Sequence, residues 1–289
     1  MRDHAGRVVS ALVALPVLYG LVWYAPPLVF TGFIVIVAVL AQYELYGMVL
    51  GTPHSGGEDP FPLAGAGLGM AFGVGVIVAL YSPSRNVVLP LVMTVLVMSA
   101  GVASLRFGRE LRVAFARAAA VVFGVWYVAW LLGHFVLLRG LPGGERWVVF
   151  VLAVTWIGDA AAYYVGRAVG GPPLAPVISP KKTVAGGIGG VVGSAATAVL
   201  GALWLVDGVT WSEAAALGAG MGVVGMMGDL VESMIKRSAG VKDSGNLIPW
   251  HGGILDKIDG LLFTAPMLYY YLLLMKGSGA PGMVALRPG

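Results

Sequence analysis

The stretch SMIKRSAGVKDSGNLIPWHGGILDKID, residues 233–259, carries an unusual share of the charge of this chain. Its ionisable side chains are Lys236, Arg237, Lys242, Asp243, His251, Asp256, Lys257 and Asp259. Only 11% of the 289 residues are charged, so a cluster of this density requires an explanation. Cations and carboxylates gathered at the end of a membrane helix suit the binding of phosphates through a divalent metal. The stretch therefore predicts a phosphate-binding site.

The rest of the chain has the composition of a polytopic membrane protein. Hydrophobic residues make up 58% of the full sequence and its mean hydropathy is +0.87, whereas soluble domains contain about 45–50% apolar residues. The absence of cysteine excludes disulfides and thiolate metal sites. The net charge of +4 is no argument for nucleic acid, and no pattern of stacking aromatic residues supports such a partner.

Apolar segments long enough to span a bilayer predict an all-α fold with about nine transmembrane helices. They cover roughly residues 8–24, 27–49, 62–81, 87–105, 113–138, 147–169, 184–206, 210–235 and 255–275. No small-residue cleavage site follows the first segment, so we expect a retained helix and not a signal peptide. Residues 1–140 would hold five helices, and residues 141–289 a catalytic region of about four, with cytoplasmic loops at 170–183 and 236–254.

Lysine and arginine in the loops predict the orientation. With the N-terminus in the cytoplasm, thirteen of the 18 cationic residues fall on the cytoplasmic side. We therefore expect a multi-pass protein of the inner membrane, whose polar active-site chamber faces the cytoplasm.

Carboxylates inside spanning segments are costly, so each is a candidate functional residue. Asp159 and Asp229 lie about 10–12 Å inside the cytoplasmic end of their helices, and Glu232 follows Asp229 by one turn. Asp256 and Asp259, at i and i+3, share one face at the start of the last helix. Four aspartates at one depth predict a pocket for Mg²⁺ or a similar hard cation. The alternative is that each acid pairs with a nearby cation and only holds the bundle together.

Other residues receive weaker predictions. Gly252 and Gly253 would let the backbone approach a phosphate beside His251. A second basic loop offers Lys181 and Lys182 together with two hydroxyls, Ser179 and Thr183, although juxtamembrane lysines also serve topology and anionic headgroups. For Glu44 we expect a structural pairing.

Glycine is abundant, at 44 residues, and two groups stand out. One lies at the start of the seventh segment and the other precedes Asp229: Gly186, Gly187, Gly189, Gly190 and Gly193, then Gly218, Gly222 and Gly225. We interpret both groups as faces for close helix packing.

The quoted stretch closely resembles the signature of phosphatidate cytidylyltransferases, the CDP-diacylglycerol synthases, from Ser233 to Asp259. Every fixed position matches except Lys257, where the family has arginine. A second block also resembles the family, and it comprises Asp159 to Tyr163, Gly166-Arg167, Leu174 to Thr183 and Gly186. It departs at Val184-Ala185, where the family usually has Trp-Glu, and at Gly171, where a basic residue is frequent.

The resemblance implies transfer of the cytidylyl group of CTP to phosphatidic acid at the bilayer, with release of pyrophosphate and Mg²⁺ as cofactor. The main metal ligands would be Asp229 and Asp256, with Asp159 and Asp259 as further candidates. The catalytic set would be Asp229, Lys236, Arg237, Lys242, Asp243, His251, Asp256 and Asp259. The substrate-binding set would be Ser179, Lys181, Lys182, Thr183, Ser233, Gly252 and Gly253. A monovalent cation and a homodimer are further expectations.

Two alternatives stay open at this point. Intramembrane acids and glycine-broken helices also occur in ion-coupled transporters, although the chain shows no internal repeat. A family member that has lost catalysis is the other alternative, because of Val184-Ala185 and Lys257.

Overall fold

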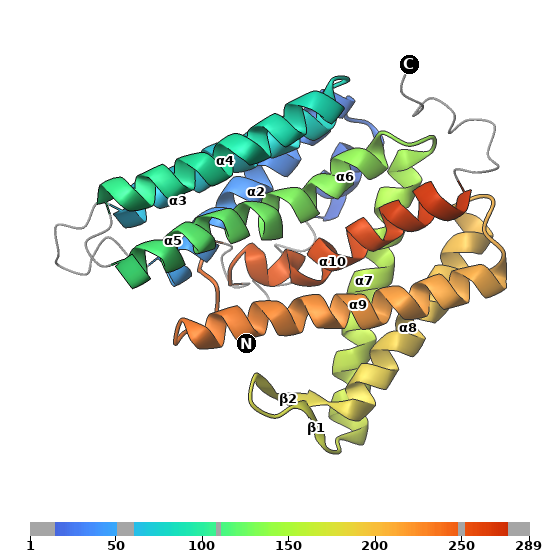
Figure 1. Cartoon of the computed structure of the whole chain (residues 1–289). Coiled ribbons are helices and arrows are strands. Elements are labelled where there is room, and N and C mark those ends of the chain that lie inside the picture. Colours follow the sequence, from blue (N-terminus) through green and yellow to red (C-terminus); the bar gives the residue numbers. More distant parts are fainter. Residues whose placement is uncertain (1–14, 51–60, 108–110, 248–251, 277–289) are drawn as a thin grey trace. The chain divides into compact units, whose positions relative to one another are not determined.

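The computed structural model describes residues 15–50, 61–107, 111–247 and 252–276 (Figure 1). Residues 15–23 are helical. The helices that follow are α2 (Pro27–Val49), α3 (Phe61–Tyr81), α4 (Arg85–Phe107), α5 (Leu111–Gly124), the π-helical η1 (Val125–Trp130), α6 (Leu131–Arg139), α7 (Gly144–Val169), α8 (Val184–Trp204), α9 (Trp211–Ser238), α10 (Leu255–Tyr271) and the π-helical η2 (Leu272–Lys276).

Eight helices in the described ranges are long and apolar enough to cross a membrane, counting α5, η1 and α6 as one. They confirm eight of the nine predicted segments. The predicted first segment, 8–24, is helical over residues 15–23, and residues 8–14 lie outside the described part. The chain is therefore an integral multi-pass membrane protein.

The fold is nearly all-α, as predicted, but one predicted loop has strand structure. Residues 170–183, predicted as a loop, contain an antiparallel hairpin of β1 (Pro173–Ala175) and β2 (Ser179–Thr183). Gly170 and Gly171 lead into it with φ of 69° and 101°, a backbone conformation that glycine adopts without steric cost. This geometry explains why a glycine occupies position 171.

The chain divides into two compact units that interleave along the sequence. Unit 1 comprises Met1–Val17, Pro26–Val136 and Ile235–Lys257, and unit 2 comprises Leu18–Ala25, Leu137–Met234 and Ile258–Gly289. The chain passes from one unit to the other within α9 and within α10.

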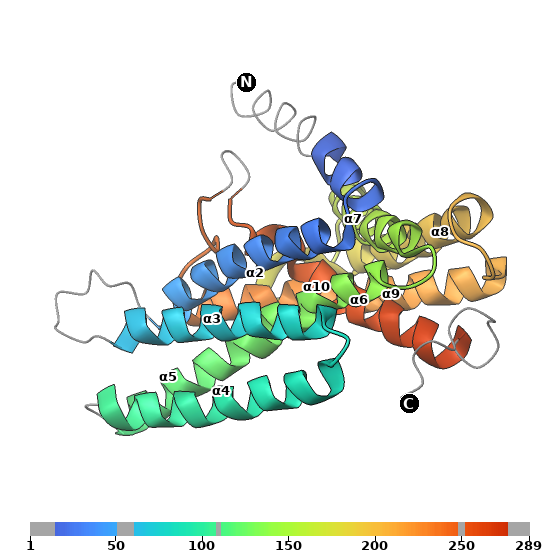
Figure 2. The same ribbon diagram turned by 90° about the horizontal axis from the view of Figure 1, so that it is seen from above.

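Unit 1 is built around α2, α3, α4 and α5, and Figure 2 shows α3 lying beside α4 along its length. A buried polar contact fixes α2 in it. The Tyr46 hydroxyl donates to the carbonyl oxygen of Val121, 2.9 Å away, in the last turn before η1. Gln42, on the same helix, donates to the Gly69 carbonyl of α3 at 3.2 Å. The second predicted segment therefore packs one face against α3 and α5 of this unit.

Unit 2 contains α7, α8 and the hairpin. Helix α8 packs against α7 and also contacts both strands of the hairpin (Figure 1). Glycines let α7 and α8 touch: a Cβ at Gly166 would lie 3.3 Å from the Gly186 Cα, and one at Gly190 would lie 3.0 Å from the Ala162 Cβ. On α9, a Cβ at Gly222 would lie 2.9 Å from the Val191 Cα. The interpretation of the glycine groups as packing faces is confirmed.

Candidate active site

A cavity of about 590 Å³ opens in unit 2 between α7, α8, α9 and the hairpin. Typical small-molecule sites measure roughly 300–1,000 Å³, so a substrate of that class fits. Small and apolar residues form much of the wall: Thr155, Gly158, Ala162, Gly166, Leu174, Gly186, Gly187, Gly190, Ser194, Met221, Gly222, Gly225 and Met226. Polar and charged residues form the rest: Asp159, Tyr163, Arg167, Ser179, Lys181, Lys182, Thr183 and Asp229.

All four residues predicted from the second basic loop thus line one cavity with two of the predicted acids. The hairpin supplies the four, and Thr183 also begins α8, since its Oγ1 accepts a hydrogen bond from the Gly186 N–H at 3.0 Å. A hydroxyl that accepts one bond still has a proton to donate, so Thr183 can cap the helix and contact a phosphate oxygen.

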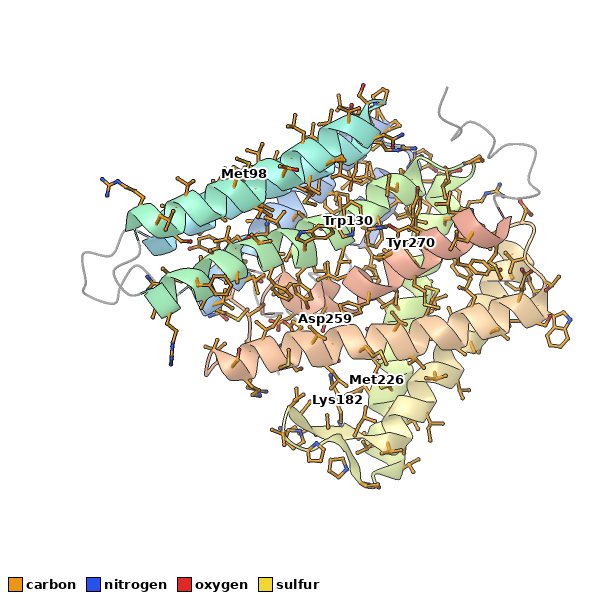
Figure 3. All side chains as sticks on the ribbon, in the orientation of Figure 1. Met98, Trp130, Lys182, Met226, Asp259 and Tyr270 are labelled. Atoms are coloured by element: carbon orange, nitrogen blue, oxygen red, sulfur yellow. The ribbon has the colours of Figure 1, made fainter. Side chains whose placement is uncertain are left out.

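Lys182 reaches from β2 to α9, where its Nζ forms an ion pair with an Asp229 oxygen. Figure 3 shows Lys182 extending from the hairpin toward the helix that carries Met226. The Lys182 and Asp229 side chains are 29% and 35% exposed. Both residues line the cavity, but the Lys182 Nζ atom itself is buried, so an anionic substrate reaches it only when the lysine turns away from Asp229.

Three carboxylates of unit 2 form a second feature of the site. One oxygen each from Asp229, Glu232 and Asp259 lies within 4.8 Å of the other two. Glu232 is buried and the two aspartates are half-buried. Gly228 makes the cluster possible, because a Cβ there would lie 2.5 Å from the Asp259 carbonyl oxygen. Oxygen donors at this spacing fit Mg²⁺, which prefers carboxylates and water, so these three residues can hold the predicted cation.

In unit 1, Asp256 lies within hydrogen-bond distance of four donor groups. Lys236 Nζ donates to Oδ1 at 2.6 Å, and the Ser244 N–H, the Ser244 hydroxyl and the Gly253 N–H donate to Oδ2 at 3.2, 3.0 and 3.0 Å. The Lys236 and Asp256 side chains are only 11% and 14% exposed. Asp256 is thus an ion-paired residue at the start of α10. Its joint role with Asp229 as a metal ligand stays a prediction.

The remaining predicted residues lie near these features in the sequence. Arg237 donates to the Val241 carbonyl at 2.8 Å, which closes the turn after α9. Lys242 and Asp243 are exposed in the segment that follows. Ser233 is buried in α9. His251 lies outside the described residues.

Sequence reasoning missed Arg167 and Ser244 as contributors, and it did not identify the partners of Glu44. Arg167 lines the cavity and donates to the Tyr163 hydroxyl at 3.1 Å. Ser244 occupies a spacer position of the signature, so its bonds to Asp256 had no signal in the pattern. Glu44, for which we expected a structural pairing, bonds to the signature stretch itself, with Ser244 and the N–H groups of residues 254 and 255 as partners.

Comparison with known proteins shows which enzymes this chain is similar to. The chain is 45% identical over 153 residues to a phosphatidate cytidylyltransferase of Synechocystis sp. (53% of this chain, 50% of that protein). It is 41% identical over 162 residues to the enzyme so named in Brucella suis (56% and 60%), and 38% identical over 151 residues to the one in Bacillus subtilis (52% and 56%).

The chain thus matches about half to three-fifths of the length of these relatives. The names of these three relatives do not favour the transporter alternative. The cytidylyltransferase family matches residues 5–275, nearly the whole chain. This protein belongs to the cytidylyltransferase family.

Proposed function

We propose that this protein transfers the cytidylyl group of CTP to phosphatidic acid, giving CDP-diacylglycerol and pyrophosphate in phospholipid biosynthesis. The observation that carries the proposal is the cavity of unit 2, where the hairpin lysines face the carboxylates of α7 and α9. Cations that hold phosphates, beside acids that hold a metal, are the groups that phosphoryl-type transfer requires. The names of the relatives supply the substrates.

The reaction exchanges one phosphorus–oxygen bond for another. A phosphate oxygen of phosphatidic acid attacks the α-phosphorus of CTP in line and forms the new bond. The bond from the α-phosphorus to the oxygen that bridges to the β-phosphorus breaks, and pyrophosphate leaves with that electron pair. The attacking phosphate monoester is already ionised near neutral pH, since its second pKa is roughly 6. The protein therefore needs no strong general base, and positioning and charge neutralisation do most of the work.

Side chains of the hairpin would provide much of that neutralisation. Lys182 and Lys181 would bind phosphate oxygens, and the hydroxyls of Ser179 and Thr183 would donate hydrogen bonds to them. Arg167, at the same cavity, would add a planar donor suited to bidentate contact. When an anion binds, Lys182 would turn from Asp229 toward the phosphate, which frees that carboxylate for a cation.

The carboxylate cluster Asp229, Glu232 and Asp259 would hold Mg²⁺, because its oxygen atoms are donors that this ion prefers. When bound, the ion would supply charge neutralisation for the leaving pyrophosphate. The assignment of Asp256 as a further ligand rests on the family resemblance.

We also propose that the active site faces the cytoplasm of a bacterial-type inner membrane. The excess of lysine and arginine in the loops on that side supports this orientation, and CTP is a cytoplasmic nucleotide. The small and apolar residues of the cavity wall suit the glycerol and acyl portion of a lipid substrate.

The test is pyrophosphate release by the purified protein in detergent with phosphatidic acid, CTP and Mg²⁺, each omitted in turn. We expect release only when all three are present. Asp229→Asn should abolish it in a folded protein, whereas Asp207→Asn, at an exposed acid, should not. Release without phosphatidic acid, or none from a folded sample, would contradict the proposal.

A further inference from the structure

A buried carboxylate of α2 has no part in the mechanism above. Glu44 is 4% exposed, and its oxygens accept three hydrogen bonds. The donors are the N–H of Ile254 at 3.0 Å, the N–H of Leu255 at 2.9 Å and the hydroxyl of Ser244 at 3.0 Å. All three lie about 200 residues further along the chain, within the signature stretch and within the same compact unit.

Two of these bonds cap a helix. Leu255 is the first residue of α10, and the first N–H groups of a helix have no partner inside it. Such groups are usually satisfied by a local Ser, Thr, Asp or Asn side chain. Here a side chain from a different helix satisfies two of them, and its negative charge suits the positive end of the helix dipole. Glu44 therefore fixes where α10 begins.

The third bond connects Glu44 to Asp256. The Ser244 hydroxyl lies 3.0 Å from Glu44 Oε2 and 3.0 Å from Asp256 Oδ2. A hydroxyl has one proton, so it donates to one carboxylate at a time. Because Ser244 lies between the two carboxylates, it fixes their positions relative to each other. Lys236 Nζ, 2.6 Å from the other Asp256 oxygen, offsets the charge of the pair.

Two glycines of the signature leave the space that Glu44 occupies. A Cβ at Gly245 would lie 2.6 Å from Glu44 Oε1, and one at Gly253 would lie 2.5 Å from Glu44 Oε2. Real Cβ atoms do not approach other atoms so closely. A side chain at either position would therefore displace the Glu44 carboxylate, and one at position 253 would displace the Ser244 hydroxyl as well.

We propose that Glu44 is a positioning residue for cytidylyl transfer: through Ser244 and the N-terminus of α10 it holds Asp256 in one orientation. The inference rests on the proposed function, because Asp256 belongs to the predicted catalytic set. It assigns a task in the reaction to the N-terminal helices, whose role the sequence left open.

The test is steady-state kinetics of Glu44→Gln, Ser244→Ala and the double variant, each per folded molecule as judged by size-exclusion chromatography and thermal unfolding. The amide of Gln faces the N–H donors and Ser244 with one NH₂ group and loses part of the network. Because small misplacement of a reacting group costs about 100-fold, we expect kcat to fall about 10- to 100-fold in each single variant. KM for CTP should change less than about threefold, since substrate-binding groups are untouched. The double variant should be little worse than the worse single one.

Glu213→Gln is the matched control, because Glu213 also bonds a backbone N–H at a helix start, that of Thr210. It should keep the wild-type kcat. A folded Glu44→Gln protein with wild-type kcat, or additive losses in the double variant, would overturn the inference. If Glu44→Gln does not fold, Ser244→Ala decides: a lowered kcat supports positioning, and a normal kcat assigns Glu44 to the fold alone. An inactive wild-type protein would instead count against the proposed function.

Discussion

The substitution Lys182→Met tests whether the ion pair between Lys182 and Asp229 serves the reaction or only the fold. Lys182 and Asp229 are in contact, and their side chains are 29% and 35% exposed. The gross attraction of such charges is about 4 kcal/mol at 4 Å and an effective dielectric constant of 20. Desolvation, side-chain entropy and solvent screening offset most of it, which leaves about 1 kcal/mol for a partly exposed pair. Methionine keeps the length and apolar stem of the lysine.

We therefore expect Lys182→Met to lower the free energy of unfolding by about 1 kcal/mol or less. Its effect on turnover should be larger. A hydrogen bond from a cation to a phosphate contributes about 1.5–3 kcal/mol, and each 1.4 kcal/mol is tenfold in rate. The value of kcat/KM should fall about 10- to 100-fold.

The assay pairs reversible unfolding in mixed micelles with pyrophosphate release. Arg146→Met is the control, because Arg146 and Asp207 form an exposed ion pair at 3.0 Å in the same unit, away from the cavity. It should cost little stability and no activity. If Lys182→Met lost more than about 3 kcal/mol of stability while each folded molecule kept its activity, the reasoning would be refuted and the pair would be structural.

Three further predictions concern Gly228 and Asp259 of unit 2 and Lys257 of unit 1. Gly228→Ala should lower the unfolding free energy by about 1–3 kcal/mol, because its Cβ meets the Asp259 backbone, whereas Gly220→Ala, which meets the flexible end of a methionine, should cost less in a thermal unfolding comparison. Asp259→Asn should raise the Mg²⁺ concentration for half-maximal activity at least tenfold, as measured by titration after chelation, while an unchanged requirement would remove Asp259 from the cation site. Lys257→Arg should change kcat less than about twofold, because the Lys257 side chain is exposed; a large loss would reveal a specific role for the lysine.

The helices could be predicted because the bilayer fixes their length and composition. Glycine packing was also readable, since small residues at three- and four-residue spacing, such as Gly186 and Gly190, allow close contact only on one face. The hairpin at 173–183 could not be predicted from the sequence. Its strands are three and five residues long, prolines interrupt them, and neither shows the alternation that marks a strand.

For the site, the sequence predicted the roles of some residues but not the contacts between them. Lys182 and Asp229 were predicted as phosphate and metal groups, but their mutual contact joins a strand to a helix and has no sequence spacing of its own. The partners of Glu44 could not be predicted for a stronger reason. Its partners are about 200 residues away, and backbone N–H groups carry no residue type that a pattern can register.

The most direct test of the central claim follows each phosphorus atom of CTP. Purified protein would be incubated with phosphatidic acid, Mg²⁺ and CTP that carries radioactive phosphorus at either the α or the γ position, and the lipids would then be extracted. Cytidylyl transfer predicts the α label in the lipid fraction, only when phosphatidic acid is present, and the γ label in aqueous pyrophosphate. Radioactivity from the γ position in the lipid would indicate a kinase, and an unlabelled lipid fraction from folded protein would contradict the account.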